Sequence, residues 1–411
     1  MGMKAFRRVL FLLAVSLLCA ANGWAVDIRG RSSTQFLWFN DYYNGRQIEL
    51  AQYLRVAATN IDKAGKFSLY GYGRAGATLQ NSDDATTDDR ANGRLYYLYG
   101  DYRGIGGKAD VKLGRQFTNL SADSSLIDGA RLDVKNVGPV GFTFLGGRNV
   151  IFGLNGELGH TGDYAAGAAV YLQGLPNTDL DFSWFRKWDQ YDVARDMLGA
   201  SFKQYLFNMV KLYGNARYDM VSEVFSDLLG GVKVFPMANL SLTGEYYQNY
   251  PTFDTTSIYS VFAVNRYKEA VVRADYTVSE KVAFNAGYTR QDFGDDEGWG
   301  NVYIFGCTLR PLETLTIDLD YDRRSGYGGD LNGGTVDVNF DATKELRLAA
   351  GVAYDVYQRD SMTGQETAKN AWLGAKYKLT KSMTTSFRIA DSVNKTSENN
   401  WQGRFVFDYD F

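Results

Sequence analysis

The ten residues Gln402–Phe411 read QGRFVFDYDF and decide the fold. Phe405, Phe407, Tyr409 and Phe411 occupy every second position, and the alternate positions carry the charged Arg404, Asp408 and Asp410 and the apolar Val406. Because side chains alternate between the two faces of a strand, the segment predicts a strand with one aromatic and one polar face. An aromatic face of this kind suits lipid, so we interpret the segment as one strand of a transmembrane barrel.

The start of the chain carries the pattern of an export signal. Lys4, Arg7 and Arg8 precede an apolar run over 9–21, and Gly23-Trp24-Ala25 suits cleavage after Ala25. The apolar run is too short for a membrane-spanning helix. We therefore expect a signal peptide over residues 1–25 and a single β-barrel domain over residues 26–411.

Alternating strands recur along the whole chain and are separated by connections of two lengths. Over 313–322, for example, Leu315, Ile317 and Leu319 share one face, and Asp318 and Asp320 share the other. Ten short turns are predicted, at 61–65, 104–107, 136–139, 174–177, 207–208, 236–238, 278–280, 310–312, 341–343 and 380–381. Longer polar loops are predicted at 80–89, 149–162, 250–265, 291–298 and 360–366.

Ten short turns and eleven loops predict an all-β fold, a transmembrane antiparallel up-and-down β-barrel of about 22 strands with periplasmic termini. Merged hairpins would lower the count to 16 or 18. No plug domain is expected, because the first strand begins close to Asp27. A barrel of 16 to 18 strands leaves an aqueous channel, whereas one of 22 is usually plugged. The lumen is therefore expected to be water-filled, narrowed by loops or occupied by another protein.

Composition fits a barrel and excludes several other classes of protein. The chain has 44 Gly, 29 Tyr and 25 Phe, but only 5 Pro and a single His. Beyond residue 25 it carries 41 basic and 47 acidic side chains, a net charge of −6 that gives no reason to expect nucleic acid binding. Cys307 is the one cysteine left after processing, so no intrachain disulfide can form.

Strand parity predicts which charged side chains line the lumen. The basic members are expected on the earlier strands: Arg131, Lys203, Lys211, Arg217 and Lys233. The acidic members are expected on the later strands: Asp318, Asp320, Asp322, Asp337, Asp408 and Asp410. A basic and an acidic wall would set a transverse field that favours polar or zwitterionic solutes. The alternative is that lumen residues need only be hydrophilic.

Motifs for chemistry are weak. His160 lies alone on a predicted loop, where it cannot form a metal cluster or a catalytic dyad, so we expect no enzyme, no metal and no cofactor. The acidic loop runs at 83–89 and 295–297 lack the ligand spacing of a calcium loop, and we interpret them as solvated. Tyrosines near strand ends, among them Tyr97, Tyr99, Tyr102 and Tyr246, are interpreted as an interfacial girdle, with a lumen sugar slide as the alternative.

The chain as a whole resembles the porin-like outer-membrane proteins of metal-reducing bacteria. The signal peptide, the short-looped strands and the segments 112–117 (KLGRQF) and 128–132 (DGARL) carry the resemblance, although this last pairing also occurs in ordinary diffusion porins. In porin-cytochrome members the barrel is a sheath around a multihaem cytochrome. This chain has no Cys-x-x-Cys-His for haem, and the Cys-x-x-Cys pair of the larger sheath proteins is absent.

Two functions follow from the sequence. The first is passive passage of ions or small hydrophilic solutes, with the loop at 149–162 or 250–265 folded inward. The second, implied by the resemblance, is a barrel sheath that carries electrons across the bacterial outer membrane with a periplasmic multihaem cytochrome. The other expected partners are outer-membrane lipid and the barrel assembly machinery.

Overall fold

The computed structural model describes residues 26–40, 45–80, 91–153, 156–172, 174–257, 265–294, 298–359, 362 and 364–411. The first strands are β1 (Asp27–Asn40), β2 (Arg46–Thr59), β3 (Phe67–Gln80), β4 (Ala91–Ile105), β5 (Ala109–Asn119), β6 (Ser124–Val137), β7 (Val140–Asn149), β8 (Ile151–Gly153) and β9 (Gly156–Leu158). Next come β10 (Tyr164–Leu172), β11 (Thr178–Asp189), β12 (Asp192–Leu206), β13 (Val210–Asp219), β14 (Val224–Met237), β15 (Leu240–Asn249) and β16 (Tyr267–Ser279). The last are β17 (Val282–Asp292), β18 (Trp299–Leu312), β19 (Leu315–Gly326), β20 (Asp330–Asp341), β21 (Leu346–Gln358), β22 (Glu366–Lys378), β23 (Met383–Asn394) and β24 (Ser397–Asp410).

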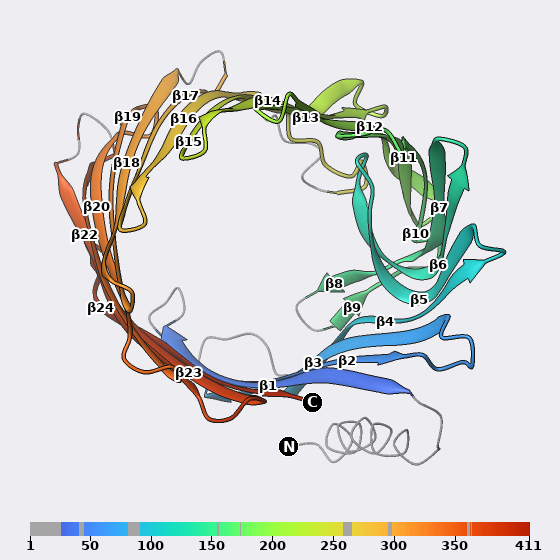
Figure 1. The fold of residues 1–411 in the computed structure, drawn as a ribbon, viewed down its shortest axis with the longest axis horizontal. Coiled ribbons are helices and arrows are strands. Elements are labelled where there is room, and N and C mark those ends of the chain that lie inside the picture. The colour runs from blue at the N-terminus through green and yellow to red at the C-terminus, as the bar shows by residue number, and fades with distance from the viewer. Residues whose placement is uncertain are drawn as a thin grey trace.

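Twenty-two of these strands form one closed antiparallel barrel, and β8 pairs with β9 as a separate hairpin. Each strand pairs with the next along the chain, β7 pairs with β10, and β1 pairs with β24 to close the ring (Figure 1). Backbone hydrogen bonds between Gly30 and Phe411, 2.8 and 3.0 Å long, extend that closing pair. The predicted all-β barrel of 22 strands is confirmed, and the described residues contain no plug domain.

The predicted alternation of short turns and longer loops holds only in part, because on the loop side β11 is joined to β12 by residues 190–191 alone and β23 to β24 by residues 395–396 alone. Each of the ten predicted turns lies at or next to a junction of consecutive strands, although 310–312 falls on the last residues of β18 and the turn itself is at 313–314. Among the described residues, no helix is long and apolar enough to cross a bilayer. The expected signal peptide (1–25) and the acidic loop runs at 83–89 and 295–297 lie outside the described residues.

The two faces of the barrel wall differ as the alternation requires. Leu319 and Tyr321 on β19, and Leu373 on β22, are large apolar side chains that remain solvent-exposed in the isolated barrel. Such side chains are the ones that lipid covers in a membrane. These features of the wall are those of an outer-membrane barrel.

The β5–β6 hairpin leaves the wall and curves inward, toward β11 and β12 (Figure 1). The pairing of β4 with β5 ends at Leu98 opposite Arg115, one residue beyond Gly114, which has φ of +121°. A β-carbon on Gly114 would collide with the carbonyl of Leu98, so only glycine allows strand β5 to depart at this point. Gly129 lies directly opposite Gly114 and packs as tightly against β7. The two glycines therefore form the bend, which lies within the Gly-Arg-Gln and Asp-Gly-x-Arg segments.

Candidate channel lining and constriction

The tip of the inward hairpin, residues Leu120–Asp123, packs on the inner face of the barrel wall. Leu120 and Ala122 form a buried cluster with Phe185 of β11 and Met197 of β12. Further members of this cluster come from β6, β7 and β10: Ile127, Leu145 and Ala165. Burying this apolar surface holds the tip against the wall. We call the inner faces of β7 and β10–β12, which the tip covers, the covered half.

Polar contacts fix the tip in the same place. Ser183 of β11 accepts a 2.7 Å hydrogen bond from the backbone N–H of Ala122, and its hydroxyl lies 2.7 Å from that of Ser121. The Arg217 Nε donates to the carbonyl of Ser121 at 3.1 Å. Lys187 Nζ lies 2.9 Å from the Asp123 carboxylate. Backbone groups that would otherwise be orphaned in a loop are thus satisfied by the wall.

Gly199 of β12 makes room for this contact. A β-carbon at this position would lie closer to the backbone of Ser121 and Ala122 than real β-carbons approach any atom. The tip therefore rests directly on a strand backbone, and a larger residue there must push it away from the wall.

One of the two loops expected to fold inward also reaches this region. The segment after β15 contacts the start of β12 through a 2.9 Å bond from the Thr255 N–H to the Ala194 carbonyl. Arg195 joins both inward elements, because its guanidinium lies 2.8 Å from Asp254 and 3.9 Å from Asp123. The described part of the 250–265 loop thus braces the hairpin tip, a four-residue connection that the sequence did not single out.

The other expected loop, 149–162, holds the β8–β9 hairpin, which lies inside the ring beside β4 (Figure 1). Arg94 of β4 donates to the carbonyl of Gly153 at 2.8 Å, and its guanidinium lies over the Phe152 ring. Arg115 binds Asp128 at 2.7 Å and also pairs with Glu157. The hairpin therefore closes the gap left where β5 departs from β4.

The basic residues predicted to line the lumen are largely engaged. Lys203 lies 2.6 Å from Asp179, and Arg131 lies 2.9 Å from Asp133. Arg217 holds the hairpin tip, as described above. Lys211 and Lys233 are direct cross-strand neighbours that lie over tyrosine or phenylalanine rings. Two of the five are therefore neutralised by carboxylates, and the other three contact neutral groups that strand parity alone does not reveal.

The acidic residues are arranged differently. Asp318 is directly opposite Asp337, and Asp322 and Asp355 flank Gly333 from either side. Within the described residues, Asp318, Asp320, Asp337 and Asp355 have no cationic partner, whereas Asp322 lies 3.5 Å from Arg324 and Asp410 pairs with Arg31 at 2.6 Å. Asp408 faces Ser33 across the closing seam. We call the inner faces of β19–β21 the bare half, because no hydrogen bond or ion pair in the described part joins their carboxylates to a loop.

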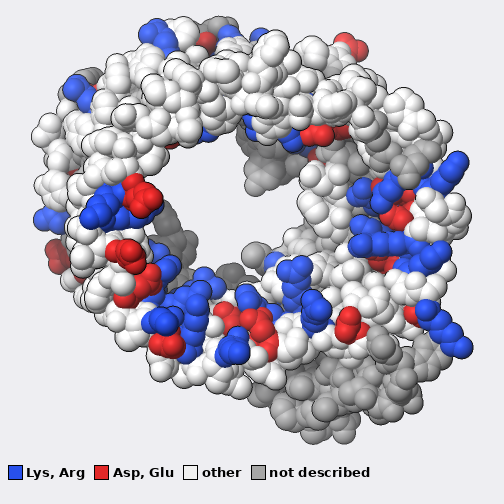
Figure 2. Space-filling view, viewed as in Figure 1, with Lys and Arg blue, Asp and Glu red and all other residues white. Residues whose placement is uncertain are grey.

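Figure 2 shows an opening through the centre of the barrel, with charged side chains gathered along its lower and left edges. These edges correspond to the strands at the two ends of the sheet, including β1, β3 and β24 in Figure 1. A further group of charged side chains lies at the right of the view, over the region of β5, β6 and β10 in Figure 1.

A row of tyrosines lies on the inner face of β2–β4. Tyr72 stacks on Tyr96 at 4.8 Å and lies 6.3 Å from Tyr53, while Tyr99 stacks on Tyr70 at 5.3 Å. Tyr72 and Tyr97 share a face with Arg55 in the strand register. The girdle interpretation is therefore wrong for Tyr97 and Tyr99, whereas Tyr102 and Tyr246 are on the exposed outer face.

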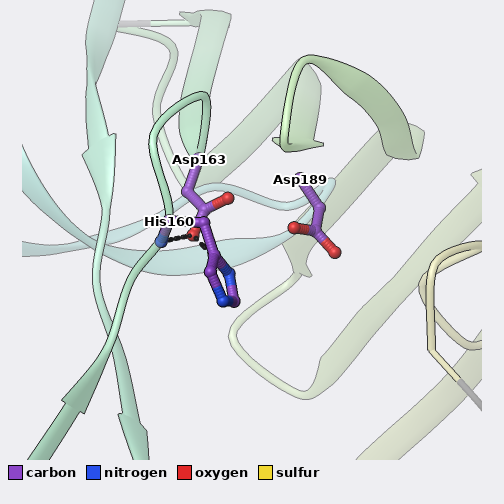
Figure 3. Close-up of side chains that lie close together, drawn as sticks. All are labelled: His160, Asp163 and Asp189. Atoms are coloured by element: carbon purple, nitrogen blue, oxygen red, sulfur yellow. Dashed lines mark hydrogen bonds and ion pairs between the residues drawn. The ribbon is translucent and has the colours of Figure 1, made fainter.

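His160 does have acidic neighbours (Figure 3). Asp163 and Asp189 bring one potential ligand atom each to within 4.8 Å of the imidazole and of one another. The Asp163 carboxylate already accepts hydrogen bonds from the N–H groups of His160 (2.6 Å) and Gln190 (3.1 Å). Burial alone would raise the pKa of Asp163, but these bonds hold it below its usual value. The arrangement ties two loops together, and strand parity contains no signal for it.

Comparison with known proteins places the fold but not the family. No family model and no curated relative matches the sequence. Among solved structures, a BenF-like porin from Pseudomonas fluorescens Pf-5 matches with TM-score 0.50 and 8% identity, over 94% of this chain and 98% of that one. OpdK of Pseudomonas aeruginosa, solved with vanillate, matches with TM-score 0.50 and 12% identity over the same shares. The chain thus has the fold of outer-membrane porins.

Proposed function

We propose that this protein is a passive outer-membrane channel for ions and small hydrophilic solutes, narrowed by the β5–β6 tip. The observation that carries the proposal is the bare half, where carboxylates on β19–β21 face an opening that no described segment fills (Figure 2). Charges without partners are costly to keep away from water, so a hydrated lumen explains them. The porin fold of the solved structures supports the same function.

The alternative, a sheath around a haem protein, gains no support from the solved structures. The inward hairpin tip and the β8–β9 hairpin also take up space that such a partner would need. Outer-membrane lipid and the barrel assembly machinery remain the partners that we propose for a channel of this fold.

The test is ion selectivity in planar bilayers. Replacing Asp318, Asp320 and Asp322 with Lys should shift the reversal potential across a salt gradient toward anion preference, most strongly at low salt. A control with the same charge change in the connections, at Glu223, Glu280 and Glu313, should shift it much less. If the purified protein inserts into the bilayer but does not conduct, the proposed channel function is wrong. If the reversal potential shifts equally in both variants, the three carboxylates do not line the lumen.

A further inference from the structure

Two pairs of like charges face each other across neighbouring strands on the inner wall. Asp318 of β19 is directly opposite Asp337 of β20, and Arg388 of β23 is directly opposite Arg404 of β24. Like charges in directly opposed positions destabilise a sheet. Two strands, β21 and β22, separate the acidic pair from the basic pair.

Neither pair is neutralised by the protein. Within the described residues, no ion pair involves Asp318, Asp337, Arg388 or Arg404. The Arg404 guanidinium donates to the Gln35 side chain at 3.0 Å, and Asp318 accepts a bond from Thr308 at 2.6 Å. The Oδ1 atom of Asp337 is buried and has no hydrogen-bond partner. A buried carboxylate oxygen of this kind requires a donor to offset its desolvation.

Trp372 of β22 lies between the two charges. Arg388 lies over its ring, with the guanidinium carbon 4.3 Å from the ring centroid. On the other side, the indole leans over Gly351 of β21, where its Nε1 and the Asp337 Oδ1 crowd the point that a β-carbon would occupy. One indole thus has a guanidinium on its face and a free carboxylate beside its N–H. We call Asp337, Trp372 and Arg388, with the opposed Asp318 and Arg404, the split-charge site.

We propose that the split-charge site binds zwitterionic solutes, the class of free amino acids and short peptides. The ammonium group pairs with Asp337 and Asp318, the carboxylate pairs with Arg388 and Arg404, and the backbone of the solute lies along the indole. A cation alone leaves the two guanidinium groups opposed, and an anion alone leaves the carboxylates of Asp318 and Asp337 opposed. A neutral solute relieves neither repulsion. The inference rests on the proposed channel, of which it names the solute class.

The experiment measures saturable block of the ion current by glycylglycine in planar bilayers. Ethanolamine, glycolate and glycolamide are the cationic, anionic and neutral probes. Glycylglycine should block at lower concentration than any of these three. Asp337→Asn and Arg388→Gln should each raise its half-blocking concentration about tenfold, the effect of losing one charged hydrogen bond.

Two further variants separate geometry from charge. Gly351→Ala changes no charge but must displace the indole or the Asp337 carboxylate, so it should weaken glycylglycine block as well. Asp275→Asn removes a carboxylate that accepts from Ser241 on β15 at 3.0 Å, away from the site, and should leave the block unchanged. If Asp337→Asn and Asp275→Asn weaken glycylglycine block equally, the block depends only on the total charge of the lumen, and the proposed site is wrong.

Direct binding provides a readout that does not depend on conduction. Glycylglycine should change the tryptophan fluorescence of the purified protein, and Trp372→Phe should abolish that change. A protein that conducts ions but shows neither block nor fluorescence change overturns the split-charge site and leaves the channel standing. A protein that binds glycylglycine without conducting overturns the channel instead.

Discussion

The covered half and the bare half are built from the same alternating strands but use their inner faces in opposite ways. On β10–β12 the inner faces include small or apolar residues such as Ala165, Phe185 and Gly199, and these receive the hairpin tip beside the charged Lys187. On β19–β21 the equivalent positions carry Asp318, Asp320 and Asp355, and none of the described loops or hairpins packs against them. The difference shows that one side of the barrel anchors the constriction, while the other is free to act on solutes.

The largest effect is expected in the covered half, at Phe185. This side chain is 0% exposed, so Phe185→Ala should cost about 3 to 5 kcal/mol of barrel stability and loosen the hairpin tip. Phe182, on the outer face of the same strand and 52% exposed, is the matched control. Unfolding in urea and single-channel conductance measure the two effects. Equal losses for both alanine variants would mean that the tip does not depend on this cluster.

In the bare half, an introduced charge should lower barrel stability more on the outer face than on the inner face. Leu319→Arg places a charge against lipid and should cost about 2 to 4 kcal/mol, whereas Asp318→Arg should cost far less. Folding titrations into lipid vesicles compare the two variants. If the costs were equal at both parities, the strand register of β19 would be wrong.

The same substitution, glycine to alanine, can be made in both halves and its effects compared. Gly199→Ala pushes on the backbone of the hairpin tip, which should cost about 1 to 3 kcal/mol and raise the conductance. In the bare half, Gly333→Ala meets only the ends of Asp322 and Asp355, at 2.5 and 2.6 Å, and these side chains can rotate away. Gly333→Ala should therefore change conductance little. A larger conductance change at Gly333 than at Gly199 would contradict the assignment of the tip as the constriction.

The smallest effect is expected at the closing seam between β1 and β24, outside both halves, where Arg31 pairs with Asp410. Both side chains are about half exposed, so Asp410→Asn should cost only about 0.2 to 1 kcal/mol. Thermal unfolding at low and high salt measures it, and the difference should shrink as salt screens the pair. A loss that salt does not change would point to the two hydrogen bonds rather than to charge.

The wall could be predicted from the sequence, but the constriction could not. Alternation and turn residues are local, so they placed the ten short turns and the strand count correctly. The hairpin tip is held by Ser183 and Gly199, more than sixty residues beyond it, and short length made the 120–123 connection look unremarkable. The apolar Leu120 and Ala122 in so short a connection between strands were the available signal. The prediction that eleven charged residues line the lumen remains to be tested by the selectivity experiments. Strand parity does not reveal ion pairs such as the one between Lys203 and Asp179.

The seam between β1 and β24 has a consequence for how the protein is made. Arg31 and Asp410 are 379 positions apart, yet their strands are neighbours in the ring. Until β24 has been synthesised and has reached the membrane, β1 remains an unpaired edge able to pair with other chains. Contacts of such long sequence separation also form slowly. Folding of this barrel should therefore be a late, all-at-once event that requires protection of the early strands, with aggregation as the competing outcome.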